Sequence, residues 1–107
     1  MGVYVMNRGG AADTLLVREG GTYVRRYAAP GRPVIAYSGR WTVDTVGSRR
    51  VVRFAAFAPR WRAESAAVER QLVGWWPVRP ERTARGTVRL PVDEEQGWAY
   101  VRVAPAE

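Results

Sequence analysis

Two short segments alternate aromatic residues with arginine, and they contain the chain's clearest candidates for chemistry. The residues at alternate positions of these segments are Tyr23, Arg25, Tyr27, Trp98, Tyr100 and Arg102. Because side chains two positions apart on a β-strand point to the same side, each trio shares one face of its strand. A guanidinium beside tyrosine hydroxyls can bind a carboxylate or phosphate through two parallel hydrogen bonds. With Tyr37 on a neighbouring strand, these six residues are the predicted lining of a site for a small anionic or amphipathic ligand.

Two other interpretations use the same residues. If the two faces point to solvent, the arginine stems simply cover the rings as ordinary cross-strand pairs. An exposed face of this kind also has the ingredients to stack bases and hold phosphates. Acidic residues interrupt the basic ones at Asp44, at Glu81 and over 93–95, and the chain has no ribonucleoprotein or helix-turn-helix signature. Nucleic-acid binding therefore ranks below small-ligand binding.

Catalytic and metal chemistry has little support in the sequence. The chain has no His, Cys or Lys, so the usual general base, thiol nucleophile and soft metal ligands are missing. Asp44, Glu64 and Glu69 are carboxylates that could act as acid or base if buried, but their spacing brings no two together. The acidic run at 93–95 can attract a hard cation, yet adjacent acids in a turn are usually just solvated. We predict no catalytic residue, no metal site and no cofactor.

Length and composition indicate one domain over residues 1–107. The apolar fraction is 47%, and all of the 17 basic residues are arginine, which gives a net charge of +7. A positive charge of this size favours anionic partners through the long-range field. The absence of cysteine excludes disulfides. The N-terminal residues do not resemble a signal peptide, and no apolar run approaches a membrane span, so we predict a cytoplasmic protein.

Short β-type runs separated by tight turns predict an antiparallel meander. The expected strands cover residues 3–6, 14–18, 22–27, 34–43, 50–57, 75–78, 87–92 and 98–103, with a loop over 7–13. Turns are expected at 19–21, 29–32, 46–49, 83–86 and 93–97, where glycine and proline supply the required dihedral angles. Gly39 inside its strand predicts a bulge or sharp bend. Such points help a sheet to close on itself.

Residues 58–77 depart from the meander pattern. Pro59 can open a helix, and Trp61, Ser65, Val68 and Leu72 then fall near one face, so we expect one short helix within 58–72. The adjacent rings at 75 and 76 should point to opposite sides of a strand that Pro77 confines to a sheet edge. We expect one ring in the core and the other at a surface. Because tryptophan is enriched in binding hot spots, Trp75 and Trp76 are the candidate interface of a homodimer. A barrel lid or a core plug explains the pair equally well.

One pair of motifs resembles a known family. Gly21-Thr22-Tyr23 after a turn, followed one hairpin later by the run Ser-Gly-Arg-Trp-Thr-Val at 38–43, is similar to small bacterial lipocalin-like barrels. The resemblance covers residues 14–57 and implies a barrel that holds a small hydrophobic or amphipathic ligand. Taken together, we predict an all-β, lipocalin-like, up-and-down antiparallel barrel of eight or nine strands with one helix. Its expected function is non-enzymatic binding of a small ligand in or at the mouth of the barrel. The alternative is an interaction module that uses an exposed aromatic and arginine face for self-association or protein binding.

Overall fold

The computed structural model describes residues 1–8, 10–57 and 75–105 of the chain. They contain nine strands, which form one sheet. The strands are β1 (Gly2–Arg8), β2 (Ala11–Arg18), β3 (Thr22–Ala28), β4 (Ile35–Val46), β5 (Arg49–Ala55), β6 (Trp75–Val78), β7 (Glu81–Arg82), β8 (Val88–Asp93) and β9 (Trp98–Ala104). The helix expected within 58–72 lies outside the described residues. The described part contains no helix that could cross a membrane.

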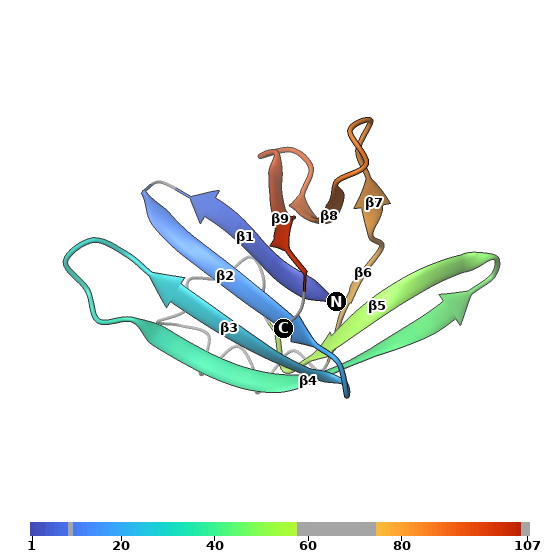
Figure 1. The fold of residues 1–107 in the computed structure, drawn as a ribbon, viewed down its shortest axis with the longest axis horizontal. Helices are drawn as coiled ribbons and strands as arrows, with labels where there is room; N and C mark the ends of the chain where they lie inside the picture. The colour runs from blue at the N-terminus through green and yellow to red at the C-terminus, as the bar shows by residue number, and fades with distance from the viewer. Residues whose placement is uncertain (9, 58–74, 106–107) are drawn as a thin grey trace.

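All neighbouring strands are antiparallel, which confirms the predicted all-β class. Their order across the sheet is β6-β5-β4-β3-β2-β1-β9-β8-β7, and the sheet curls into a half-barrel (Figure 1). The prediction of a closed barrel was wrong for the described residues, because the sheet ends at β6 on one side and β7 on the other. These two edge strands are consecutive in the chain and only Arg79 and Pro80 separate them.

Prolines explain why the sheet stays open at this point. The extended segment 75–82 pairs first with β5 through β6 and then with β8 through β7. Pro77 and Pro80 lie in or beside this segment and Pro91 lies in β8, and none of the three has a backbone N–H to donate to a ladder. The sequence had placed residues 75–78 at an edge for this reason, and the structure confirms it.

Strand β4 spans two partners and bends the sheet between them. It pairs with β3 up to Arg40 and with β5 from Trp41 onward, without a break in register at Gly39. Of the predicted bulge or sharp bend, the bulge is therefore absent at Gly39. Gly39 is required for a different reason: a Cβ there would lie 2.5 Å from Cε2 of the Tyr23 ring. The glycine allows the ring to lie flat against β4.

The first hairpin is longer than the sequence predicted, because the loop expected over 7–13 is part of β1 and β2. Ala11 and Asp13 continue the alternation of Leu15 and Val17, and all four side chains are buried on the concave face. Local alanine and glycine content indicated a loop, but burial of one face overrides such propensities. The strand β7 was also not predicted, since two residues leave no periodic signal.

The convex face of the sheet has an aliphatic centre. Val5 pairs with Val101, and Leu16 pairs with Val3 on one side and Val24 on the other. Because their chain neighbours point into the core, these side chains point outward, and Val101 is 39% exposed. Three exposed arginines lie beside this aliphatic centre, at Arg18, Arg26 and Arg40. An antiparallel sheet with one solvated face normally carries polar residues there.

Candidate functional site

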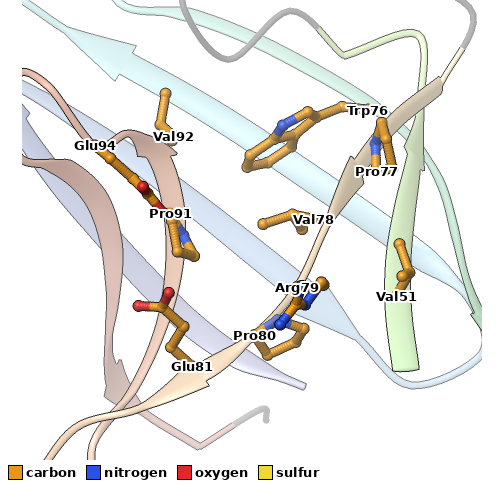
Figure 2. A pocket seen from close by; sticks show the side chains of 10 residues that line it. All are labelled: Val51, Trp76, Pro77, Val78, Arg79, Pro80, Glu81, Pro91, Val92 and Glu94. Atoms are coloured by element: carbon orange, nitrogen blue, oxygen red, sulfur yellow. The ribbon is translucent and has the colours of Figure 1, made fainter. Parts of the chain in front are cut away.

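A hollow of about 430 Å³ lies between the edge strand β6 and the unpaired side of β8, and we call it the seam groove. Figure 2 shows Trp76 and Val78 pointing from β6 toward Pro91 and Val92 of β8. β6 and β8 lie near one another here but do not pair. The groove therefore results from the break between β6 and β7.

The lining of the seam groove combines apolar side chains with charged groups. Its apolar residues are Val51, Trp76, Pro77, Val78, Pro80, Pro91 and Val92. Its charged residues are Arg79, Glu81 and Glu94. Trp76 pairs with the buried Phe54 and so belongs to the inner side of the wall, whereas Pro77 pairs with Arg53 and belongs to the outer side. The groove is thus lined from both the inner and the outer side of the wall, by apolar and by charged side chains.

The residues predicted to line a ligand site gather mainly around Phe57. The rings of Tyr23, Tyr37 and Tyr100 lie 5.4, 6.4 and 6.2 Å from the Phe57 ring centre, each edge-on or nearly so. The guanidinium carbon of Arg25 lies 4.7 Å from the same centre. No special role was predicted for Phe57, because it is simply the last residue of a predicted strand. These contacts make a packed core at the described residues.

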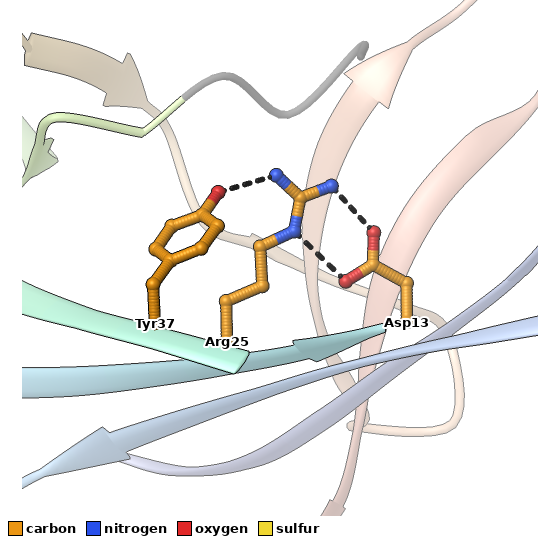
Figure 3. Close-up of polar contacts among 3 residues, drawn as sticks. All are labelled: Asp13, Arg25 and Tyr37. Atoms are coloured by element: carbon orange, nitrogen blue, oxygen red, sulfur yellow. Dashed lines mark hydrogen bonds and ion pairs between the residues drawn. The ribbon is translucent and has the colours of Figure 1, made fainter. Parts of the chain in front are cut away.

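Arg25 is held inside this core by two neighbouring strands (Figure 3). Its Nε donates to Asp13 Oδ1 at 3.0 Å and its Nη2 to Asp13 Oδ2 at 2.7 Å, while Nη1 donates to the Tyr37 hydroxyl at 2.7 Å. The two charged side chains are 0% and 1% exposed. Arg25 thus contacts a carboxylate through two parallel hydrogen bonds. The carboxylate, however, belongs to the protein itself.

Electrostatics keep this arginine charged. Burial by itself lowers the pKa of Arg25, but the hydrogen bonds and charge of Asp13, together with Tyr100 and Tyr37, raise it to a net value above that of free arginine. A charge buried without such partners would be very costly. Asp13 was missed because it was assigned to a loop. The available signal was its place two residues before Leu15, on the buried face of the same strand.

The remaining predicted residues are not part of this cluster. Tyr27 is buried in a separate small group with Ala11. Trp98 is half-buried at the edge of the main core. Arg102 is exposed and lies over Gly2, where a Cβ would be 2.7 Å from its Nε. The structure therefore brings together four of the seven predicted residues and leaves three apart.

The tryptophan pair divides as the sequence predicted. Trp76 stacks on Phe57 with ring centres 4.9 Å apart and on Phe54 at 5.4 Å. Trp75 points the other way and is 46% exposed. The first ring thus joins the core to the seam groove, and the second remains available at the surface.

The buried aromatics bear on the other interpretations as well. Tyr23, Tyr27 and Tyr100 are buried, so they do not form the exposed stacking face that nucleic-acid binding required. Within the described residues, no group of three or more His, Cys, Asp or Glu side chains is arranged to hold a metal ion. Comparison with known proteins adds no family assignment: no family model, no curated protein and no solved structure matches this chain.

Proposed function

We propose that this protein binds a small amphipathic molecule, without catalysis, in the seam groove. The observation that carries the proposal is the groove itself, whose lining combines apolar side chains with three charged groups. Its volume of about 430 Å³ lies within the usual range for small-molecule sites, roughly 300–1,000 Å³. The proposal keeps the role implied by the resemblance to lipocalin-like barrels and moves the site from the interior to the gap in the wall.

Packing argues for the groove over the interior. Tyr23, Arg25 and Tyr100 are fully buried, and Arg25 already donates three hydrogen bonds to protein groups. A ligand placed among them would have to separate the Arg25–Asp13 pair, which is costly when both charges are out of water. Binding in the seam groove requires no such separation.

Binding can be located with a neutral amphipathic dye, N-phenyl-1-naphthylamine, and ¹⁵N-labelled protein. We expect the dye to become fluorescent on binding and to shift the amide signals of Val78, Arg79, Glu81, Val92, Asp93 and Glu94 together with the Trp76 indole signal. Shifts concentrated at Tyr23, Arg25 and Tyr37 would instead place the ligand in the interior and refute the groove.

A groove-filling variant supplies a second test. Val78→Phe adds bulk where the side chain faces the hollow, and we expect it to weaken dye binding at least tenfold. Val101→Phe adds the same bulk on the convex face and is the matched control. Circular dichroism of both variants shows whether the fold is kept. Equal dye binding by both folded variants would contradict the proposal.

The second candidate function is interaction with another protein or with a second copy. It is favoured by the aliphatic centre of the convex face and by the exposed Trp75. Contiguous exposed apolar surface is a common sign of an interface. Sedimentation equilibrium of the protein and of Trp75→Ser tests the homodimer: self-association that the variant loses would support it, and a monomer at high concentration would refute it.

A further inference from the structure

The charges at the seam groove run against those of the whole molecule. The net charge of the chain is +7. Yet the groove is lined by two carboxylates, Glu81 and Glu94, against one guanidinium, Arg79. A second hollow that shares Pro91, Val92 and Glu94 with it adds Asp93 and Glu95. Four of the ten acidic residues of the chain therefore lie at this one place.

The backbone around the groove adds an acceptor without a donor. Pro77 pairs with Arg53 of β5, and Pro91 pairs with Ala99 of β9. A proline leaves a ladder intact only at a non-hydrogen-bonded position, where its nitrogen and its carbonyl face away from the paired strand. For Pro77 that other side is the seam groove, whereas Pro91 stands beside a register shift of the β8–β9 ladder. The Pro77 carbonyl can therefore accept a hydrogen bond from a ligand, and neither proline nitrogen can donate one.

Among the nearer arginines, Arg53 lies opposite Pro77 but pairs with Asp44 at 3.3 Å. Arg18 and Arg26 lie on β2 and β3, and each of these strands is at least three ladder steps from both β6 and β8. At about 4.8 Å a step, that is roughly 14 Å or more along the sheet. Salt screens exposed charges over about 8 Å at physiological ionic strength. The charge of Glu81 is partly offset by Arg89, whose Nε lies 3.5 Å from the carboxylate. Glu94 is the groove carboxylate that has no ion pair among the described residues.

Trp76 adds a favourable surface for a cation beside the carboxylates. Its ring lines the groove, and the face of an indole attracts ammonium groups more strongly than other aromatic side chains do. We infer that the ligand of the seam groove carries a cationic, hydrogen-bond-donating head, such as an alkylammonium, on an apolar body. The grounds are the carboxylates, the Pro77 carbonyl and the Trp76 ring. The inference rests on the proposed function, because it names the class of molecule that the same groove binds.

The test compares three probes that share an eight-carbon tail and differ in the head. Octylammonium, octanoate and octyl glucoside, each below its micelle concentration, compete with N-phenyl-1-naphthylamine for the full-length protein. We expect octylammonium to bind at least tenfold more tightly than octanoate, and added salt to reduce this ratio because the attraction is electrostatic. In the double variant Glu81→Gln/Glu94→Gln the ratio should fall below about threefold. Glu19→Gln, which removes an exposed carboxylate in the turn between β2 and β3 that lines neither hollow, is the matched control and should keep the ratio.

Each outcome decides one of the two proposals. A wild-type ratio near one, a preference for octanoate, or a cation preference that survives in the double variant overturns the inference about the head group. In those three cases displacement of the dye still supports an amphipathic site. If the dye does not bind, or if no octyl compound displaces it, the proposed function fails together with the inference.

Discussion

Replacing Asp13 by asparagine removes the charge opposite Arg25 while keeping almost the same shape. The amide can still accept one hydrogen bond, but its NH₂ group meets a guanidinium nitrogen where a carboxylate oxygen had been 2.7 or 3.0 Å away. One bond is lost, two donors face each other, and a full positive charge remains buried. Breaking a buried pair from one side in this way costs about 3–5 kcal/mol.

That cost is large for a domain of this size. A chain of 107 residues has a free energy of unfolding of roughly 5–15 kcal/mol. With a urea m value of about 2 kcal/mol/M, a loss of about 4 kcal/mol moves the unfolding midpoint down by roughly 2 M. Equilibrium unfolding in urea, followed by far-ultraviolet circular dichroism, measures this shift directly.

Two further variants separate the burial argument from a general sensitivity to lost carboxylates. Asp44 pairs with Arg53 at 3.3 Å, but the two side chains are 55% and 39% exposed. Asp44→Asn should therefore cost less than about 1 kcal/mol. The apolar replacement Asp13→Leu with Arg25→Met removes both charges and should recover most of the lost stability. The reasoning is refuted if Asp13→Asn loses less than about 1 kcal/mol, or if both single carboxylate variants cost the same.

Three more predictions concern packing, titration and the sheet edge. Gly39→Ala places a methyl group 2.5 Å from the Tyr23 ring and should displace that ring, whose hydroxyl donates to the Ala55 carbonyl at 2.6 Å. We expect urea unfolding to show a loss of about 1–3 kcal/mol in the free energy of unfolding, and a smaller loss for Tyr23→Phe. Burial raises the pKa of Tyr4, although Arg102 lowers it in part, so the tyrosine loses its proton at a lower pH in the unfolded chain than in the folded one. The contribution of this residue to the free energy of unfolding should therefore be fully present below about pH 10 and fall above it. The fall should be smaller in Tyr4→Phe. Pro77→Thr restores a backbone donor on the edge strand β6 and should promote association through that edge. Association would appear as earlier elution in size-exclusion chromatography. Unchanged elution would show that the proline does not protect the edge.

Local chemistry made the meander predictable. The turns at Glu19-Gly20-Gly21 and at 93–97 depend on residues that reach unusual dihedral angles, and the structure has turns at both places. Alternation also placed Tyr23, Arg25 and Tyr27 on one face correctly. These features are encoded within a few neighbouring residues, so a single sequence is enough to find them.

Long-range pairing was not predictable in the same way. Asp13 and Arg25 lie on different strands and meet only because β2 and β3 pair in one register and not another. The seam groove depends on where β6 stops pairing and β7 starts, which involves strands β5 and β8 far apart in the chain. Because the sequence does not show which charged residues meet in space, the expectation of an anionic ligand rested on the net charge and on Arg25. The charged groups that line the seam groove favour a cationic ligand instead.

The pairing of β1 with β9 has a consequence for how this chain reaches its fold. Val3 is opposite Ala104, so the ladder that joins the two ends of the described chain has the greatest sequence separation in the sheet. A circular permutant that links the present ends and opens between Arg79 and Pro80 would make the strand sequence identical to the strand order in space. Every pairing would then join strands that are consecutive in the chain, which lowers the contact order and should speed folding. Among the described strands, β6 and β7 are thus the one consecutive pair that can be separated by a backbone cut without parting two hydrogen-bonded neighbours.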